Sequence, residues 1–461
     1  MCMDEIVEGR PLCPPEYNPF VAARHFPYCI GAINAAESPL RSRGDARRAG
    51  GSASYNHPMT FMTSTERRAT VSLASIYALR MLGLFLVLPV FALEAAKYPG
   101  GNDPAWVGFT MGIYGLTQGI LQIPFGMASD KLGRTRVILF GLVVFAIGSF
   151  VAAAADSLTG LMIGRAIQGA GAVSAAVTAL LADLTRDEVR TKAMALIGMS
   201  IGLMFALSLV VAPILVSHIG LAGLFTLTGV LTVLAMGVVQ WWTPPEPLLH
   251  KASTRAPLLA VLKQPALARL NFGVFALHAV QLSMWVSLPS MLVAAGLAKA
   301  EHWHVYLPAV LASFVLMGGV FPLERRGYLR GVFLSAISLV LVVQVALLMY
   351  TNGASLDRHY FQSNAELYFL GAVLFVFFCG FNVLEATQPS LVTKVAPPEL
   401  RGTALGVYNT LQSLGLFAGG FLGGALVKWG GHQAVFGVAA VVMLAWLAMA
   451  WGMKVSIAPA K

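Results

Sequence analysis

Long apolar stretches alternate with short polar ones over most of the chain. An α-helix rises about 1.5 Å per residue, so about 20 apolar residues cross the ~30 Å hydrocarbon core of a bilayer. Six such stretches precede and six follow a Pro-rich and basic segment at 243–264. They begin near Val71, Trp106, Val137, Leu158, Ala193, Leu221, Leu267, Val305, Gly331, Leu367, Gly402 and Ala434. This pattern predicts an all-α membrane protein with twelve transmembrane helices in two six-helix bundles.

These stretches divide the chain into segments with different expected roles. We expect a cytoplasmic extension at 1–67, a six-helix bundle at 68–243, a cytoplasmic linker at 244–264, a second bundle at 265–455 and a cytoplasmic tail at 456–461. The extension is polar and Arg-rich, lacks helical periodicity and carries no recognisable signal peptide. It is expected to be disordered, or to result from a start codon assigned too early, with Met59 or Met62 as the natural start. A regulatory tail is the alternative.

Composition identifies lipid as the main solvent. Hydrophobic residues make up 57% of the chain and charged residues 11%, whereas soluble domains carry about 25% charged residues. The net charge is +10, but the cations lie in short loops between apolar stretches, so we expect no nucleic-acid partner. The four cysteines are too scattered to predict a disulfide framework or a CxxC metal site.

The positions of Lys and Arg predict the orientation in the membrane. With an even number of spans, both termini lie on one side. If that side is the cytoplasm, 25 of the 31 Lys and Arg face inward, and the exceptions are Lys97, Lys299, Arg358 and Lys428 in outer loops and Arg80 and Arg165 within spans. By the positive-inside rule we expect a multi-pass protein of the inner (plasma) membrane with both termini in the cytoplasm.

The two halves of the chain repeat each other. The segment 182–195, after the fourth span, resembles 393–406, after the tenth, and an Arg holds the same place in both. A fainter echo links 130–136 with 324–330. Duplicated halves that enclose a midplane site are typical of secondary transporters, so we expect two pseudo-symmetric bundles.

The most specific motif is the loop between spans two and three, Gly126-Met-Ala-Ser-Asp130-Lys-Leu-Gly133-Arg134-Thr-Arg. Gly126 and Gly133 permit a tight turn. Asp130 can accept hydrogen bonds at a helix N-terminus, and Arg134 can clamp a carboxylate, for which Asp183 is the expected partner.

This loop resembles the signature loop of the major facilitator superfamily. The resemblance implies a major facilitator fold in which the loop latches the two halves together, with Asp130 facing the start of span eleven near 399–403. A solvated basic loop that only orients the chain is the alternative.

Span four carries a second motif, Leu161-Met-Ile-Gly-Arg165-Ala-Ile-Gln168-Gly-Ala-Gly-Ala, which resembles a motif of the drug:proton antiporter branch of that superfamily. A charged Arg inside the membrane costs at least ~2.5 kcal/mol, so it should face a polar cavity. Gln168 shares the face of Arg165. A polar stripe of Tyr114, Gln118 and Gln122 on span two is expected to meet it. A static, hydrogen-bonded core Arg is the alternative.

Further runs resemble the same branch over most of residues 70–453, among them 78–90, 112–126 and 382–390. Span five departs from the branch, with Ala212-Pro213 where Gly-Pro is usual, which weakens the case for antiport. One member of the branch carries a soluble C-terminal domain that this chain, ending eight residues after Met453, is expected to lack.

Proton coupling requires a group inside the membrane that can change its charge, and the spans hold few carboxylates. Glu385 lies deep in span ten, about 13 Å from the cytoplasmic end by helix rise, and is the first candidate. His278 on span seven is the second and Arg165 the third. A static hydrogen-bonded acid and an interhelical histidine donor are the alternatives. Glu94 and Asp156, at the outer edge, are weak candidates.

The substrate cavity is expected between the two bundles. Its lining should be largely apolar, with Phe85, Met284, Phe377 and Phe381 in it, which suits a lipophilic or drug-like substrate. The expected further contacts are Arg80, Tyr114, Gln118, Gln122, Gln168, Gln281, Trp285 and Asn382.

Glycines recur at helical spacing on three spans. They are Gly108, Gly112, Gly115 and Gly119 on span two, Gly198 and Gly202 on span five, and Gly415, Gly419 and Gly423 on span eleven. Such ridges allow close backbone approach, so we expect sliding surfaces between the halves, with ordinary tight packing as the alternative.

These features predict a secondary active transporter, specifically a proton-coupled exporter of a small molecule that works by alternating access as a monomer. Its expected partners are the substrate, protons and lipid, and the proton gradient stands in place of a cofactor. An ATP-driven pump would need a GxxxxGK[ST] loop and an enzyme a metal or nucleophile constellation such as HExxH, and the sequence has neither. The alternatives are a uniporter or proton symporter for a sugar or organic ion, and a transport-inactive sensor on the same fold.

Overall fold

The computed structural model describes residues 61–246, 258–323, 328–353, 363–397 and 400–453. Every regular element within these ranges is a helix. The described residues belong to one compact unit, 58–461. The extension up to residue 60, most of the linker and the predicted tail lie outside them.

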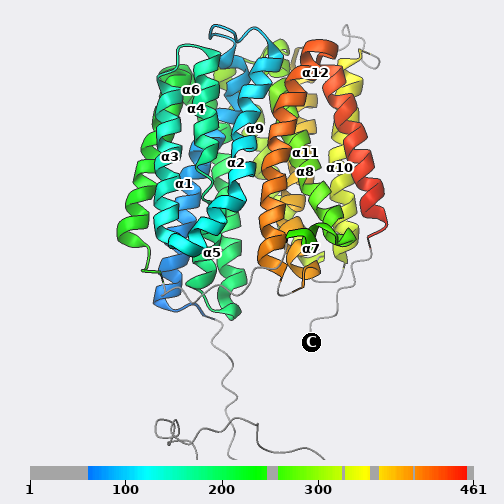
Figure 1. Ribbon diagram of the computed structural model, residues 1–461. Helices are drawn as coiled ribbons and strands as arrows, with labels where there is room; N and C mark the ends of the chain where they lie inside the picture. The colour runs from blue at the N-terminus through cyan, green and yellow to red at the C-terminus, as the bar shows by residue number, and fades with distance from the viewer. Residues whose placement is uncertain (1–60, 247–257, 324–327, 354–362, 398–399, 454–461) are drawn as a thin grey trace, which may run out of the picture. The chain divides into compact units, whose positions relative to one another are not determined.

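The described helices fall into two halves (Figure 1). The first half contains α1 (Ser64–Ala95), α2 (Pro104–Leu132), α3 (Arg134–Ala153), α4 (Leu158–Ala170), α5 (Ser174–Asp183), α6 (Asp187–Gly237) and the π-helix η2 (Val238–Trp242). The short α7 (Leu258–Leu262) precedes the second half. That half contains α8 (Pro265–Ala294), the 3-10 helix η3 (Lys299–Glu301), α9 (Trp303–Leu323), α10 (Leu329–Thr351), α11 (Ser363–Val395) and α12 (Arg401–Trp451).

These helices make twelve membrane crossings. Eight helical stretches are long and apolar enough to span a bilayer, and α4 and α5 together form one of them. The helices α6 and α12, of 51 residues each, both turn at a glycine and therefore hold two crossings each. Helices α2 and α9 run alongside the others and complete the set (Figure 1). Within the described residues, the predicted twelve-helix architecture is confirmed.

The two glycine turns preserve the predicted duplication. Gly220 has φ 64° and ψ −176°, and Gly431 has φ 66° and ψ −172°. A positive φ favours glycine because a β-carbon would collide with the backbone. The same turn stands between the last two spans of each half, as expected for pseudo-symmetric bundles.

Polar side chains fix the start of the first span. Thr63 and Glu66 form a capping box, with Thr63 N 2.8 Å from Glu66 Oε2 and Glu66 N 3.2 Å from Thr63 Oγ1. Arg186, in the turn between α5 and α6, donates to Glu66 Oε1 at 2.8 Å. Because of this cap, α1 begins at Ser64, ahead of the bundle boundary predicted at residue 68.

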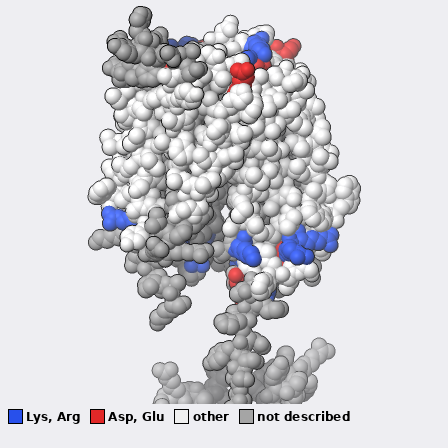
Figure 2. All heavy atoms as spheres, turned by 180° about the vertical axis from the view of Figure 1, so that it is seen from behind, with Lys and Arg blue, Asp and Glu red and all other residues white. Residues whose placement is uncertain are grey.

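We call the end of the molecule with the start of α1 and the end of α12 the terminal end (Figure 1). The opposite end, where α6 and α12 turn, is the distal end. In Figure 2, Lys and Arg of the described residues gather toward the terminal end, further charges lie at the distal end, and the belt between them shows none. An apolar belt between two charged rims is what a bilayer requires.

Span four is broken, which the sequence pattern did not predict. Helix α4 ends at Ala170, α5 begins at Ser174, and residues 171–173 are not helical. At Gly171, a β-carbon would lie 2.4 Å from the Gly141 carbonyl oxygen of α3, so only glycine fits. The break leaves the first N–H groups of α5 without helical partners inside the first half.

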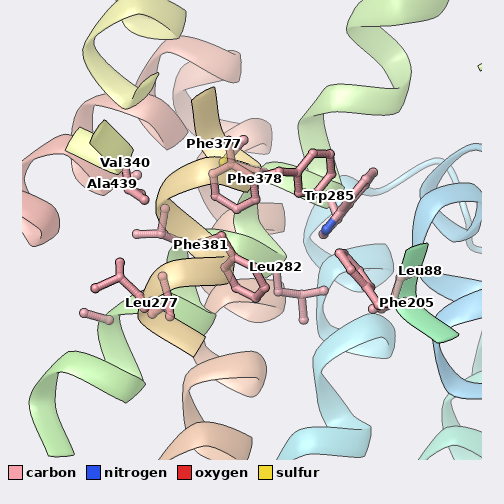
Figure 3. Close-up of a cluster of buried hydrophobic side chains, with 14 of the residues drawn as sticks. Leu88, Phe205, Leu277, Leu282, Trp285, Val340, Phe377, Phe378, Phe381 and Ala439 are labelled. Atoms are coloured by element: carbon pink, nitrogen blue, oxygen red, sulfur yellow. The ribbon is translucent and has the colours of Figure 1, made fainter. Parts of the chain in front are cut away.

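Aromatic side chains from both halves meet in one hydrophobic core. The Phe205 ring of α6 lies 6.5 Å from Trp285, 6.1 Å from Phe378 and 6.2 Å from Phe381, centre to centre. It also lies 5.1 Å from Phe85 of α1. Figure 3 shows Phe205 reaching toward Trp285 from the first half. We call these five residues the interhalf aromatic cluster, whose ring contacts stabilise the contact between the halves.

Helices α2 and α12 approach closely across the halves. A β-carbon at Gly108, Gly112 or Gly115 would lie 2.2, 2.7 or 2.4 Å from a carbonyl oxygen of α12. No side chain fits at such distances, so these positions require glycine. The close backbone approach predicted for span two is therefore present.

The ridge predicted on span eleven lies elsewhere. Gly415, Gly419 and Gly423 pack against α8 inside the second half, whereas Gly420 and Gly424, on another face of α12, contact α2. The prediction that the first three glycines slide between the halves is wrong. Glycines occupy two faces of this helix, and the sequence alone does not show which face crosses.

Four glycines of α6, α9 and α12 have no close neighbours on their β-carbon side. No atom lies within 4 Å of a β-carbon placed at Gly198 or Gly202 of α6, Gly318 of α9 or Gly406 of α12. The glycines predicted on span five thus face open space in this conformation. Over the described residues, the contacts given above between the halves lie from the distal end to the middle of the molecule, and these four glycines take no part in them.

Candidate functional site

Three polar side chains meet between α8, α11 and α12 in the second half. Gln412 Nε2 is 2.8 Å from His278 Nε2 and 3.2 Å from Glu385 Oε1. His278 Nε2 is 3.4 Å from Glu385 Oε2. We call these residues the His–Gln–Glu site. Two of the predicted proton-coupling candidates are thus brought together by a residue that the sequence did not single out.

Hydrogen bonds set the proton positions in this site. His278 Nδ1 lies 2.9 Å from the Val274 carbonyl oxygen, one turn earlier on α8, so Nδ1 carries a proton and donates it. Nε2 is then free to accept a hydrogen bond from the Gln412 amide, whose other hydrogen points to Glu385. A proton added at Nε2 would turn the 3.4 Å contact with Glu385 into an ion pair.

The two ionisable groups of the site differ in access. The Glu385 side chain is 37% exposed and that of His278 only 5%. Glu385 Oε2 is buried beside His278 and has no hydrogen-bond partner, so the exposed part lies elsewhere on the side chain. Phe381, one turn before Glu385, lies 6.1 Å from the His278 ring and belongs to the interhalf aromatic cluster. The site therefore adjoins that cluster.

Two arginines are buried in the first half. Arg80 of α1 donates to the Tyr114 hydroxyl at 2.8 Å and to Ser174 Oγ at 3.2 Å. Its guanidinium stands 5.3 Å from the centre of the Phe145 ring, within cation–π range. Two residues predicted for the cavity, Arg80 and Tyr114, are thus in direct contact.

Arg165 of α4 meets the polar stripe of α2, as predicted. It donates to the Met111 carbonyl oxygen at 3.2 Å and to Gln168 Oε1 at 3.3 Å, and it lies 5.0 Å from the Tyr114 ring centre. Gln168 in turn donates to Ser149 Oγ at 2.8 Å. All these partners belong to the first half, so the three proton-coupling candidates are not assembled in one place.

The remaining residues predicted for the cavity are dispersed. Asn382 donates to Ser313 Oγ of α9 at 2.9 Å. Gln281 and Trp285 are buried on α8, and Trp285 Nε1 has no hydrogen-bond partner. Gln122 is buried on α2, and neither atom of its amide has a partner.

The loop between α2 and α3 forms a charge cluster within the first half. Arg134 donates to Asp183 Oδ2 at 3.0 Å and to Ser129 Oγ at 2.9 Å, and it forms an ion pair with Asp130. Asp183 is therefore the partner that the motif predicted. Residues 398–399, at the expected contact with span eleven, lie outside the described residues, and the latch between the halves stays a prediction.

Glu246 caps the third span from a distant part of the chain. Its Oε2 accepts a hydrogen bond from Thr135 N at 2.9 Å, and α3 has no side-chain cap at its own N-cap position. Gly133 adopts φ 102°, and a β-carbon there would lie 2.7 Å from Glu246 Oε1. The segment that follows η2 at the end of the first half therefore packs against the predicted latch loop through Glu246.

Two ion pairs join the halves at the distal end. Glu94 binds Lys97 at 2.6 Å and Lys299 of the second half at 2.8 Å. Asp103, before α2, binds Lys428 of α12 at 2.6 Å. The hydrogen bond from Lys428 lowers the pKa of the Asp103 carboxyl. Glu94, a weak proton-coupling candidate, is therefore a link between the halves.

The family follows from comparison with known proteins. The model described as Major Facilitator Superfamily matches residues 73–420. The chain is 41% identical over 403 residues to the inner membrane transport protein YajR of Escherichia coli (strain K12), covering 85% of each chain. It is 26% identical over 361 residues to the quinolone resistance protein NorA of Staphylococcus aureus (strain MSSA476), covering 75% of this chain and 86% of NorA. The crystal structure of the human organic anion transporter MFSD10 shares the fold, with a TM-score of 0.62 and 18% identity over 84% of this chain and 100% of that chain.

Proposed function

Because the chain belongs to the major facilitator superfamily, and so is a transporter and not an enzyme, we propose that it exports a small molecule across the inner membrane in exchange for protons. The observation that carries this proposal is the His–Gln–Glu site. Ionisable groups within a membrane domain are costly and mark proton or ion paths. We assign proton exchange to Glu385, with His278 as the coupled partner and Gln412 as the bridge between them.

Glu385 can exchange protons with water because 37% of its side chain is exposed. An ionised Glu385 accepts the Gln412 hydrogen bond and carries a negative charge. A proton on Glu385 removes that charge, and a neutral acid loses less hydration energy than a carboxylate when the halves close over it. In this scheme, substrate binding beside Glu385 and protonation of Glu385 exclude each other. Such competition is the basis of exchange, and it requires no cofactor.

The described conformation supplies one state of an alternating-access cycle. Ion pairs and close helix contacts join the halves from the distal end to the middle, as in a conformation closed at the distal end. With the terminal end in the cytoplasm, as the Lys and Arg distribution predicts, this is the inward-facing state. The outward-facing state must break the Glu94–Lys299 and Asp103–Lys428 pairs. The glycine contacts of α2 with α12 let the halves tilt without interlocking side chains.

Reconstituted Glu385→Gln protein tests the proton assignment. The assay compound is the first to stabilise the purified protein in a thermal-shift screen, which starts with quinolones because NorA is named for resistance to them. We expect flux driven by a pH gradient to fall at least about tenfold, because the amide cannot ionise, while binding of the compound persists.

The matched control is Glu366→Gln on the same helix. Glu366 lies near the distal end, where it accepts a hydrogen bond from the Tyr350 hydroxyl at 3.2 Å, and its loss should leave proton-driven flux unchanged. Full proton-driven flux in Glu385→Gln vesicles would contradict the assignment. Wild-type flux that ignores the pH gradient would indicate a uniporter instead.

A further inference from the structure

The buried arginines of the first half have no acidic counter-ion. Arg80 and Arg165 are 1% and 2% exposed. Their partners are hydroxyls, an amide oxygen and a backbone carbonyl, and neither forms an ion pair with a described Asp or Glu. The Nε atom of each has no hydrogen-bond partner. A buried charge without a counter-ion is costly, so the surroundings of these arginines favour an anion.

The break in span four adds positive potential at the same place. Helix α5 has ten residues, and Val173 before it provides no side-chain cap. The unpaired N–H groups at a helix N-terminus carry partial positive charge and attract anions. Arg80 Nη1 is 3.2 Å from Oγ of Ser174, the first residue of α5, so its guanidinium lies at this N-terminus.

Gln122 points independently to a missing ligand. It is 1% exposed, yet neither its Nε2 nor its Oε1 has a partner. On α2 it shares a face with Tyr114, which contacts Arg80, and with Gly126 one turn later. A β-carbon at Gly126 would lie 3.5 Å from Cβ of Ala175 in the first turn of α5. Gln122 therefore lies on α2 between Tyr114, which contacts Arg80, and Gly126, which lies against the first turn of α5.

We infer that Arg80, Gln122 and the N-terminus of α5 bind the acidic group of an organic anion, and that this anion is the transported substrate. The inference rests on the proposed function and names its substrate class. A carboxylate, sulfonate or phosphate would neutralise the guanidinium and accept hydrogen bonds from Arg80 Nε and Gln122 Nε2, which have none now. Arg165 shares Tyr114 with Arg80 and adds to the potential without contacting the anion.

The substrate anion should also carry an apolar body. Phe85 packs against the cluster of Leu84, Tyr114 and Phe145 that surrounds the arginines. It also contacts Phe205 of the interhalf aromatic cluster. Apolar surface is thus continuous from the anion site to the contact between the halves. Tyr77, Gln118 and Ser174 are 7–8% exposed, slightly more than the two arginines.

Exchange of such an anion for a proton has a definite electrical sign. Outward movement of the anion and inward movement of the proton both carry positive charge into the cell. Membrane potential and pH gradient therefore drive the exchange in the same direction.

Binding of three probes with one ring system tests the inference. The probes are 1-naphthylacetate, its neutral amide 1-naphthylacetamide and the cation 1-naphthylethylammonium, measured by thermal shift and isothermal titration with the purified full chain. We expect the wild-type protein to bind the acid at least about tenfold more tightly than the amide or the amine, the effect of one hydrogen bond to a charged group. Arg80→Gln should remove this preference, and Arg80→Lys should keep most of it.

Two more variants keep the test decisive. Gln122→Leu retains both arginines and should weaken acid binding about threefold, which covers the case that Arg80→Gln does not fold. Arg68→Gln is the control, because Arg68 is exposed and donates to the Trp242 carbonyl oxygen at 2.7 Å, outside the site.

Three outcomes would overturn the inference: a preference for the amine or the amide, acid binding that survives both Arg80→Gln and Gln122→Leu, or no acid binding by the wild-type protein. These measurements need no gradient. Their failure would leave the Glu385 flux experiment valid, and the two proposals can fail separately.

Discussion

The two halves of this transporter treat charge in opposite ways. In the first half, Arg80 and Arg165 are enclosed on all sides and bonded to neutral groups. In the second half, Glu385 is partly exposed and lies beside His278. A guanidinium stays protonated in proteins, whereas a carboxylate and an imidazole can each gain or lose a proton. The first half thus holds permanent positive charges, and the second half holds groups that are able to change their charge.

The two sites also differ in how firmly they are held. A β-carbon at Gly169 of α4 would lie 2.1 Å from Thr117 Oγ1 and 2.2 Å from the Tyr114 carbonyl oxygen, so α4 is pressed against α2 where Tyr114 contacts both arginines. Along α12, Gly406 has no atom within 4 Å of its β-carbon position. The fixed charges thus sit in a preformed framework, whereas 37% of the Glu385 side chain is exposed.

The substitution Gly169→Val should have the largest effect of the changes that probe this contrast. It forces α4 away from α2, and we expect the free energy of unfolding to fall by about 3 kcal/mol. The measurement is detergent-induced unfolding followed by tryptophan fluorescence.

Gly371→Ala on α11 is the control for that loss. Its β-carbon would be 3.7 Å from Val305 Cγ1, an ordinary contact, and alanine has the higher helix propensity, so the change should leave stability unchanged or raise it by up to about 1 kcal/mol. Equal losses in the two variants would remove the distinction between a rigid and a loose half.

The substitution Gln412→Ala should have an intermediate effect, on coupling more than on folding. It deletes the donor shared by His278 and Glu385, and proton-driven flux should fall about tenfold, as expected for a lost hydrogen bond to a charged group. The pH profile of flux in proteoliposomes is the readout. Gln433→Ala, at an exposed position of the same helix, should leave both rate and profile unchanged. If Gln412→Ala behaves like this control, the bridge has no part in proton exchange.

The smallest effect is expected at the distal end. Lys428 lowers the pKa of Asp103, so the ion pair is intact above the usual Asp pKa of about 3.9 and is lost as the pH falls through the lowered value. Its contribution to the closed distal end should therefore be constant from about pH 5 to pH 8. Lys428→Gln should raise distal accessibility about twofold over this whole range, because exposed ion pairs contribute little.

A cysteine introduced at Leu88, in a background without the native cysteines, reports this accessibility through its labelling rate. A change that appears only at one end of the pH range would show that another group, and not Asp103, controls the distal contact.

The sequence predicted most of the fold because lipid imposes simple rules on it. Span length and the six-and-six division follow from the hydrophobic pattern, and all the helices expected within the described residues are present. The Arg134–Asp183 contact was also predictable, since the motif fixes one partner and few carboxylates lie near it. Local rules of this kind need no knowledge of how helices rotate against each other.

The features that the sequence did not reveal depend on helix rotation and backbone breaks. Gln412 was visible as a glutamine within an apolar span, but its role required the relative placement of α8, α11 and α12. Glu246 caps Thr135 across 111 residues. The break in span four lies inside a motif that reads as a continuous helix, and Gly171 gave the only hint of it. Pairings across the halves, such as Asp103 with Lys428, likewise became evident only from distances.

The turns at Gly220 and Gly431 join the last two spans of each half into one bent helix pair, α6 or α12. The first span of α6 carries Phe205, which contacts the opposite half, and the first span of α12 carries Gln412. Only Gly220 and Gly431 leave helical geometry at these turns, so no loop separates the two spans of a pair. We therefore expect a displacement at the His–Gln–Glu site or at the interhalf aromatic cluster to reach the outer span of the same helix pair. We therefore expect the thickness and stiffness of the surrounding bilayer to affect the rate of transport through these outer spans.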